Sequence, residues 1–449
     1  MKTTTKLDSD DLRGLVLGLA LPSMVAQFVS VLYSIVDRMY IGNIPEIGET
    51  ALAGVGICGP IVTMIAAFAS MVGIGGGPLV SIRLGAKREK EAEKILSNCF
   101  AFLSAIAVCV MLLSYLLKDS LLRWFGASEA VFPYADQYIT VYLAGTVFAL
   151  LSTGMNQFII CQGYSRTAMH AVLIGAVSNI VLDPIFIFGL HMNVAGAALA
   201  TILSQLLSCA FVLRFLFSDR PALRIRFLPV ERKIIQNVFL VGLTPFLIIA
   251  FDNVMLIALN AMITKYGGGQ RGDMLLTCNT ILQSFMLIIT MPLGGITGGT
   301  QTILGYNYGA RRPDKIRAAQ KWILCVGFLF CLIMFVAAQT IPQYFIYIFT
   351  RDPAYVELTV RIIRLYTVGV LFLSVQYTIV DGFTGMGIYK YSFVLSAWRK
   401  VLYFACVFLI PAFFGVDRIF LCEPVSDLLG PLGSVVLYLT LGRKLLKCL

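Results

Sequence analysis

AVSNIVLDPIFIFGL, the stretch from Ala176 to Leu190, places Asn179, Asp183 and Pro184 inside an otherwise apolar run. A charged side chain at the middle of a bilayer costs about 2.5–3.5 kcal/mol on insertion scales, so this acid is expected to face the protein interior and to have a partner. Asn179 lies four residues before Asp183, on the same face of a helix. Pro184 removes one backbone hydrogen bond beside the acid and is predicted to open and bend the helix there. We interpret the stretch as a membrane helix with a functional carboxylate.

The composition of the whole chain fits a protein embedded in lipid. Of the 449 residues, 58% are hydrophobic and 13% are charged, and the mean hydropathy is +0.85. The surface of a soluble domain does not tolerate such values. We count twelve apolar runs long enough to cross a hydrocarbon core of about 30 Å, which needs about 20 helical residues. The predicted fold is an all-α polytopic membrane protein with twelve transmembrane helices.

Two stretches far apart in the chain share one pattern. LALPSMVAQ at 19–27 opens the first predicted helix, and GLTPFLIIA at 242–250 opens the seventh with a proline in the matching place. The interval from the first proline to an RLGA turn nearly equals the interval from the second proline to an NYGA turn. The sequence therefore predicts two six-helix lobes related by an internal repeat. We assign the N-terminal lobe (helices 1–6), a basic cytoplasmic linker and the C-terminal lobe (helices 7–12) to residues 1–217, 218–233 and 234–449.

This repeat architecture indicates transport. Parallel repeats usually enclose a substrate cavity at their interface, and alternating access arises when one lobe rocks against the other. A flippase for lipid-linked oligosaccharides or lipid precursors would have the same architecture, but its cavity should be strongly basic. An integral membrane enzyme is the remote alternative, and the sequence contains no DDxxD, HExxH or GxSxG motif to support it.

The distribution of Lys and Arg predicts the orientation. Most of the 35 basic residues fall in alternate segments, which are assigned to the cytoplasm because positively charged loops stay inside. We therefore expect a multi-pass protein of the plasma (inner) membrane with both termini in the cytoplasm. The bias also accounts for the net charge of +11, so we expect no nucleic-acid partner. The segments assigned to the inside carry Lys2, Lys6 and Arg13, Arg83–Lys94, Arg166, Arg214–Lys233, Arg311–Lys321, Lys390–Lys400 and Arg443–Lys447.

Further polar side chains are predicted to lie near Asp183. The next helix returns after a short turn at Met192, and Thr201 is as far from this turn as Asp183 is, so the two should sit at similar depth. VLYSIVDRMYIGN in the first helix places Tyr33 and Asp37 four residues apart on one face. Such an oxygen-rich set could hold a hard monovalent cation, and two close acids could instead share a proton. The sequence leaves proton and sodium open.

The two halves differ in this chemistry. In the repeat register Asp37 corresponds to about Asn260, while Asn179 and Asp183 correspond to roughly Cys406 and Ile410. The acids of this pattern occur only in the first half. A purely structural role would more easily be shared by both repeats, so we place the ion or proton site in the N-terminal lobe.

Several of these motifs also occur together in one transporter family. They are the proline Pro22, VDRMYIGN at 36–43, the RLGA and NYGA turns, GMNQFIICQG at 154–163 and NIVLDPIFIFG at 179–189. With them, nearly the whole chain resembles the multidrug and toxic compound extrusion (MATE) transporters, particularly the branch with DinF-like and MepA-like members. The resemblance implies export of organic, often cationic, amphipathic compounds in exchange for protons or sodium. By motif position it implies that the coupling-ion site is formed by Asp37, Asn179, Asp183 and Thr201. It also implies that Tyr33 and Asn156 support this site and that the first helix bends at Pro22.

The sequence departs from another branch of the family. The NorM-like members look similar overall but rely on acids in the C-terminal lobe. Asp252 lies about one residue out of register with one of these positions, and Asp381 does not align with the other. Both acids are kept as secondary candidates for the ion site.

Other conspicuous residues are interpreted as structural. His170 and His191 are too far apart to suggest a metal pair, and the eleven cysteines form no CxxC pair. The glycines of GIGGGP at 73–78 and PLGGITGGTQ at 292–301 lie inside spans, where close helix packing explains them better than phosphate binding. We expect no cofactor besides the coupling ion, no metal centre beyond a monovalent cation, and a monomer that binds small organic cations within the lipid bilayer.

Overall fold

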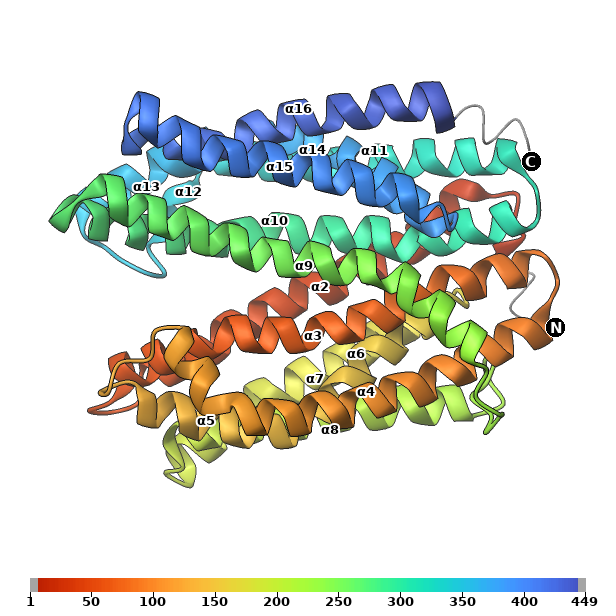
Figure 1. The fold of residues 1–449 in the computed structure, drawn as a ribbon, viewed down its shortest axis with the longest axis horizontal. Helices are drawn as coiled ribbons and strands as arrows, with labels where there is room; N and C mark the ends of the chain where they lie inside the picture. The colour runs from red at the N-terminus through yellow and green to blue at the C-terminus, as the bar shows by residue number, and fades with distance from the viewer. Residues whose placement is uncertain (1–6, 443–449) are drawn as a thin grey trace. The chain divides into compact units, whose positions relative to one another are not determined.

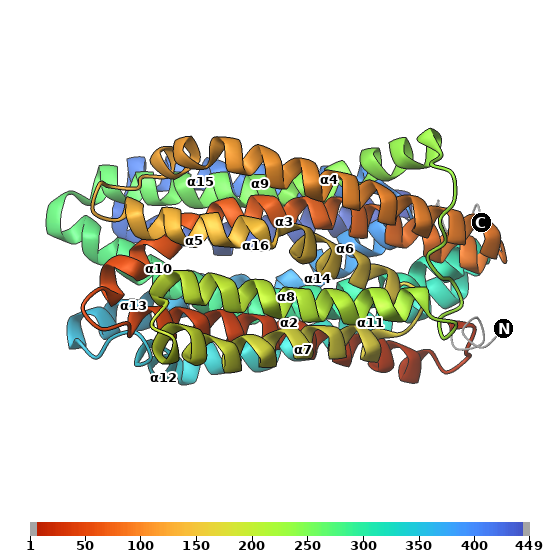
Figure 2. The ribbon, with the colours of Figure 1, turned by 90° about the horizontal axis from the view of Figure 1, so that it is seen from below.

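The computed structural model describes residues 7–442, and these residues are almost entirely helical (Figures 1 and 2). In a bilayer every backbone polar group must be satisfied within the protein, and helices achieve this within one segment. The elements are, in chain order, α2 (Leu12–Gly42), α3 (Gly48–Gly85), α4 (Glu89–Trp124), α5 (Phe132–Ala144), α6 (Thr146–Ile160), α7 (Ser165–Pro184), the π-helix η1 (Ile185–Gly189), α8 (Asn193–Phe217), α9 (Arg232–Gly267), α10 (Gly269–Gly309), α11 (Pro313–Thr340), α12 (Pro342–Ile346), α13 (Pro353–Tyr366), the 3-10 helix η2 (Thr367–Gly369), α14 (Val370–Gly385), α15 (Tyr389–Phe414), the 3-10 helix η3 (Val416–Leu421), α16 (Cys422–Leu437) and the π-helix η4 (Tyr438–Gly442).

The helices are long enough to cross a membrane. Within residues 7–442, eleven helical segments meet the length and hydropathy expected of a span, and α5 with α6, bent by 58°, forms a twelfth. The predicted all-helical polytopic fold is thereby confirmed. Lys2, Lys6 and Arg443–Lys447, which the sequence assigns to the cytoplasm, lie outside the described residues.

The chain divides into two compact units. Unit 1 consists of Val25–Ile249 together with the N-terminal residues through Ser9, and unit 2 consists of Asp10–Met24 and the chain from Ala250 onward. The borders therefore lie within α2 and α9, shortly after Pro22 and Pro245. Each of these two long helices contributes to both units.

Unit 1 is built around α3. This helix contacts α4, α5 and α6, while α8 contacts α6 and α7. Glycines allow these helices to approach closely: a Cβ atom on Gly73 would lie 2.9 Å from the carbonyl oxygen of Gly154, and one on Gly242 would lie 1.9 Å from that of Met71. The close packing predicted for the GIGGGP segment is observed.

The segment at 218–231 is fixed to unit 1 rather than free. Leu223 and Ile225 are buried, and the backbone N–H of Leu223 donates to Oε1 of Gln162 at 2.8 Å. Further along, the N–H of Glu231 donates to Oδ1 of Asn98 at 2.7 Å. The basic residues assigned to this connection thus belong to a segment that is hydrogen-bonded to residues at the ends of α4 and α6.

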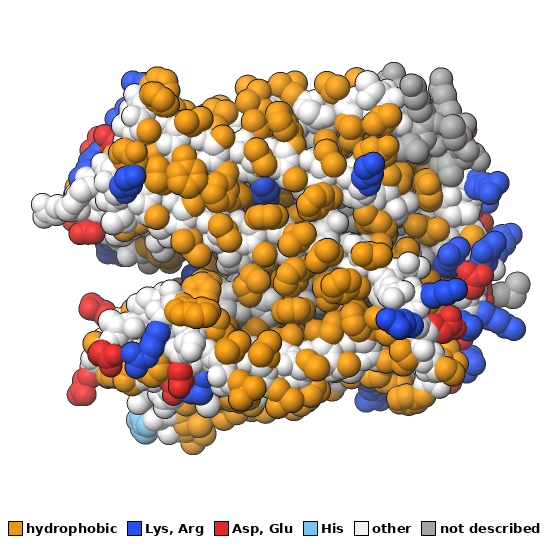
Figure 3. All heavy atoms as spheres, in the orientation of Figure 1, with side chains coloured by type: hydrophobic (Ala, Val, Ile, Leu, Met, Phe, Trp, Pro, Cys, Tyr) orange, Lys and Arg blue, Asp and Glu red, His pale blue; other side chains and the backbone are white. Residues whose placement is uncertain are grey.

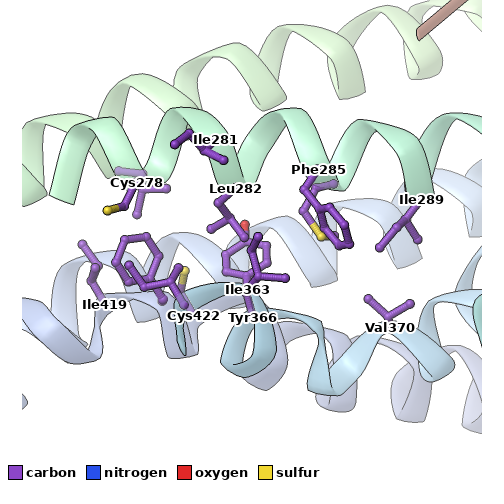
Figure 4. Close-up of a cluster of buried hydrophobic side chains, with 14 of the residues drawn as sticks. Cys278, Ile281, Leu282, Phe285, Ile289, Ile363, Tyr366, Val370, Ile419 and Cys422 are labelled. Atoms are coloured by element: carbon purple, nitrogen blue, oxygen red, sulfur yellow. The ribbon is translucent and has the colours of Figure 1, made fainter. Parts of the chain in front are cut away.

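Unit 2 has its own apolar core. Figure 4 shows side chains of α10, among them Phe285 and Ile289, facing Ile363, Tyr366 and Val370 from α13 and the start of α14. In the packing of this unit α10 contacts α11 and α14, and α15 contacts α16. On the face drawn in Figure 3, hydrophobic side chains cover the middle of the helices and most charged ones lie toward the helix ends, as expected for a surface in contact with lipid.

Two positively charged side chains are placed differently from the sequence assignment. Arg399 and Lys400 were assigned to a cytoplasmic segment, but they lie inside α15, and each side chain is only 14% exposed. The assignment grouped Lys390–Lys400 as one inside segment, whereas α15 begins at Tyr389, so that Arg399 and Lys400 lie within this helix. Both side chains have acidic partners, described below.

Candidate functional site

The predicted acid of α7 lies in the interior of unit 1. Asp183 is 0% exposed and Asn179 is 2% exposed. The side-chain Nδ2 of Asn179 donates to Oδ1 of Asp183 at 3.2 Å and to Oγ1 of Thr201 on α8 at 3.4 Å. Thr201 is therefore connected to the acid through the amide rather than by a direct hydrogen bond. The four-residue spacing and the equal depth of the two helices bring these three side chains together.

Asp37 joins this group from the second half of α2. Its carboxyl group lies close enough to that of Asp183 for the two to interact directly. Two ionised carboxylates at this proximity repel one another, and either a proton on one of them or a bound cation would relieve that repulsion. Within the described part of the chain, neither acid forms an ion pair with Lys or Arg, and the nearest positive charge acting on Asp37 is its neighbour Arg38.

Several acceptor oxygens at this site have no donor. Among the described residues, Oδ1 of Asp37, Oδ1 of Asn179 and Oδ2 of Asp183 are buried without a hydrogen-bond partner. Buried polar atoms are normally satisfied, and an unsatisfied one indicates a missing ligand, water or ion. Carboxylate and amide oxygens are suited to a proton or to a hard cation. The site therefore lacks positive charge.

Tyrosines and an amide surround the acids. Tyr33 and Tyr138 both lie close enough to Asp37 for a direct electrostatic interaction, and the rings of Tyr138 and Tyr142 stack with centroids 6.0 Å apart. Tyr142 lies close enough to Gln205 of α8 for the two side chains to interact. Sequence reasoning missed the last three, although Tyr138 and Tyr142 in YITVY, and Thr201 and Gln205 in TILSQ, show the same four-residue spacing that identified Asn179 and Asp183.

Two predicted residues have other surroundings. Nδ2 of Asn156 on α6 donates to the backbone carbonyl of Ala168 at 3.3 Å. This amide therefore bonds to the backbone of α7 and not to the acids. Pro184 was predicted to open the helix, but the chain continues directly into the π-helix η1. A π-helical turn accommodates the missing proline N–H without a break in the span. At Pro22, α2 is also continuous.

The secondary candidates in unit 2 have partners of their own. Asp252 of α9 pairs with Lys400 and is half-exposed. Asp381 of α14 accepts a hydrogen bond from Oγ1 of Thr297 and interacts with Gln301. Neither lies in a set of unpartnered oxygens like that around Asp183.

The geometry can be set beside known proteins. The model of the MatE family matches residues 22–185 and 247–409, more than half of the chain. The chain belongs to the MATE family. The two matched segments correspond to the two halves of the predicted repeat, and the family identifies the protein as a multi-pass membrane transporter and not an enzyme. Members of the MATE family couple transport to cations and act on drug-like small molecules.

Individual MATE proteins are similar over nearly the full length. The multidrug export protein MepA of Staphylococcus aureus is 23% identical over 431 residues, which cover 95% of this chain and 93% of MepA. MepA of Staphylococcus haemolyticus is 24% identical over 372 residues, covering 82% and 79% of the two chains. The resemblance to MATE transporters seen in the sequence is confirmed, at an identity that leaves substrates and coupling ion open.

Solved structures share the fold. A crystal structure of a MATE protein in complex with MaD3S superimposes with a TM-score of 0.91 at 23% identity and covers 100% of this chain and 99% of that one. An outward-facing multidrug resistance MATE transporter superimposes with a TM-score of 0.88 at 23% identity, and the match covers 100% of this chain and 98% of that one. A transporter of the same superfamily from Pyrococcus furiosus gives 0.91 at 22% identity with the same coverage.

Proposed function

We propose that this MATE protein is a secondary active antiporter that exports organic, often cationic, amphipathic compounds in exchange for protons or sodium. The observation that carries the proposal is the carboxyl pair of Asp37 and Asp183, which has unpartnered buried oxygens and, within residues 7–442, no Lys or Arg in an ion pair with it. A buried charge without a partner is unstable, so this pair has a strong affinity for a positively charged ligand. MepA, to which the chain is similar, is named as a multidrug exporter.

In this proposal each side chain has a distinct role. Asp37 and Asp183 bind the coupling ion. The amide of Asn179 donates to both the Asp183 carboxylate and the Thr201 hydroxyl and so keeps them together. Tyr33 and Asn156 belong to the surrounding network. When the ion neutralises the acids, the second half of α2 repacks against them, and the helix bends at Pro22. Ion and drug then compete for the same lobe.

The arrangement of lobes is also part of the proposal. The N-terminal lobe 1–217 and the C-terminal lobe 234–449 alternately open to the two sides, and both termini face the cytoplasm. The protein acts as a monomer in the plasma (inner) membrane. Export then requires the ion to enter unit 1 from outside and to leave toward the cytoplasm.

The test is dye efflux from proteoliposomes under an imposed pH gradient or an imposed sodium gradient. We expect one gradient to drive efflux in the wild type, and Asp37→Asn and Asp183→Asn to abolish that drive. Asp136→Asn is the matched control, because Asp136 is a partly buried acid of unit 1 that already pairs with Lys118. Efflux at the wild-type rate in Asp183→Asn would refute the coupling role. Failure to export any organic cation, with movement of lipid-linked sugars instead, would support the flippase.

A further inference from the structure

A connected series of polar side chains crosses the core of unit 2. It begins at Asn260 of α9, which follows Pro245 at the same spacing at which Asp37 follows Pro22. Nδ2 of Asn279 donates to Oδ1 of Asn260 at 2.9 Å, and Nε2 of Gln283 lies 3.4 Å from Oδ1 of Asn279 and 3.5 Å from the hydroxyl of Tyr366. The series therefore runs from α9 through α10 to α13, where Tyr366 stands in the apolar core (Figure 4).

The series ends in a cluster of three charged side chains. The Tyr366 hydroxyl donates to Oε2 of Glu423 at 3.3 Å. Nη2 of Arg399 donates to Oε1 of Glu423 at 2.6 Å and to Oδ1 of Asp427 at 2.7 Å, and its Nε reaches the same Asp427 oxygen at 3.0 Å. The side chains of Arg399, Glu423 and Asp427 are 14%, 10% and 0% exposed. We call these three residues the arginine–carboxylate cluster.

The cluster has one negative charge too many. Two carboxylates face one guanidinium, and Lys400, whose charge also acts on both of them, is paired with Asp252, so that three carboxylates share two cations. One oxygen reflects this imbalance: Oδ2 of Asp427 is buried and, among the described residues, has no hydrogen-bond partner. The remaining three carboxylate oxygens have donors. A single positive charge at Oδ2 would balance the cluster.

The number of free oxygens decides which ligand fits. A hard metal cation is usually held by about six oxygens, and the cluster offers one free carboxylate oxygen. A proton needs a single lone pair. We propose that Asp427 binds and releases a proton, which makes unit 2 a second proton-binding unit of this transporter, separate from Asp37 and Asp183.

The charges that act on Asp427 come from several helices. Within residues 7–442, titratable groups from six helices face Asp427 or its partners. They are Asp252 (α9), Cys331 (α11), Tyr366 (α13), Tyr377 and Asp381 (α14), Arg399, Lys400 and Tyr403 (α15), and Cys422 and Glu423 (α16). Only Arg399 and Lys400 among these are cations. The proton therefore relieves a repulsion between Asp427 and Glu423 that the guanidinium balances only in part.

The proton site lies against a 3-10 turn inside the helical span Pro353–Gly385. Gly369, the last residue of η2 between α13 and α14, is so close that a Cβ atom there would lie 2.5 Å from Cβ of Asp427. A change of charge on Asp427 thus acts directly on the junction at which α13 ends and α14 begins. Loss of the proton is expected to loosen this junction, since a buried carboxylate attracts water.

The inference is tested on the carboxyl groups themselves and does not depend on which compound is exported. Infrared difference spectra of the purified full-length protein are recorded between mildly acidic and alkaline pH in an Asp37→Asn/Asp183→Asn background, which removes the acids of unit 1. We expect a C=O band of a protonated carboxyl that disappears at alkaline pH. Adding Asp427→Asn should remove the Asp427 component of this band, whereas adding Asp417→Asn, an exposed acid of unit 2 that pairs with Arg271, should leave it unchanged.

A second variant keeps the test decisive if Asp427→Asn does not fold. Asp427→Glu retains the carboxyl group in altered surroundings, so the titrating band should persist at a shifted frequency. A band that keeps its frequency and amplitude in both Asp427 variants, or the absence of any titrating band in the background, would overturn the proposal. Loss of gradient-driven efflux in Asp183→Asn together with an intact Asp427 band would support both proposals independently.

Discussion

Units 1 and 2 each contain a pair of neighbouring buried acids, but they balance the charge of this pair differently. Asp37 and Asp183 of unit 1 are surrounded by an amide, a hydroxyl and phenols, whereas Glu423 and Asp427 of unit 2 share the guanidinium of Arg399. A carboxyl pair without a fixed cation must take its positive charge from a mobile ion. A pair with a fixed cation is also part of the fold, because removal of either partner leaves the other charge buried and unpaired. The difference predicts transport defects in unit 1 and stability defects in unit 2.

The largest expected effect is on transport through unit 1. Asp183→Asn should reduce gradient-driven efflux by at least about tenfold, since loss of even an outer-shell group commonly costs 10–100-fold at an ion site. Initial rates of dye efflux from proteoliposomes measure this, and the variant should still fold because Asn keeps the shape of Asp. Equal losses in Asp183→Asn and in the control Asp136→Asn would remove the distinction between the site and the rest of unit 1.

A second prediction concerns the stability of unit 2. Arg399→Met should destabilise the protein by about 3–5 kcal/mol, because two buried carboxylates lose their partner. Adding Glu423→Gln and Asp427→Asn should restore most of that stability by removing the orphaned charges. Unfolding in mixed detergent micelles measures both. In unit 1, Asp37→Asn should change stability by less than about 1.5 kcal/mol, since it removes no partner of a fixed ion pair. Similar losses in both units would contradict the comparison.

A third prediction uses two glycines that lie at helix junctions. Gly145 ends the junction of α5 and α6, and a Cβ atom there would meet the side chain of Ile202 at 2.5 Å; the same atom on Gly369 would meet Asp427 and, at 3.3 Å, the backbone of Pro424. Overpacking typically costs about 1–3 kcal/mol. Gly369→Ala should fall at the upper end, because Asp427 is held by Arg399, and Gly145→Ala at the lower end, because Ile202 can change rotamer. Thermal unfolding of both variants in parallel checks the order, and the reverse order would show that Asp427 is not held rigidly.

Sequence reasoning located the unit 1 group because local rules were sufficient there. Asn179 and Asp183 share a helix face through their spacing, and the short turn at Met192 fixed the depth of Thr201. The sequence predicted only that Asp37 and Asp183 lie near each other. It could not predict their direct interaction, since the relative position of α2 and α7 is not encoded in either helix alone. Tyr138 and Gln205 were overlooked, although their four-residue spacings were visible.

Sequence reasoning failed for the arginine–carboxylate cluster. The statement that the acids of the pattern occur only in the first half held for the repeat register of Asp37 and Asp183, but Glu423 and Asp427 are buried acids of the second half. Arg399 was counted with Lys390–Lys400 as part of an inside segment on the ground of its charge, and the acids on α16 have no polar run around them that would mark a site. Charges that neutralise one another between two helices can be found only when the packing of those helices is known.

The smallest expected effect is the loss of stability when a solvent-exposed ion pair is removed. This loss is the reference against which the contribution of the buried ion pairs is judged. Asp10 lies 2.8 Å from Nζ of Lys315 and is 97% exposed, and the hydrogen bond and charge of Lys315 lower the pKa of Asp10 below its ordinary value of 3.8. The pair therefore contributes stability that is fully present above that value and is lost as the pH falls through the lowered pKa. Asp10→Asn should leave the unfolding temperature near neutral pH almost unchanged, because exposed pairs are screened by solvent. Any small difference from the wild type should vanish in strong acid. A loss as large as that of Arg399→Met would mean that burial is not what separates the arginine–carboxylate cluster from ordinary ion pairs.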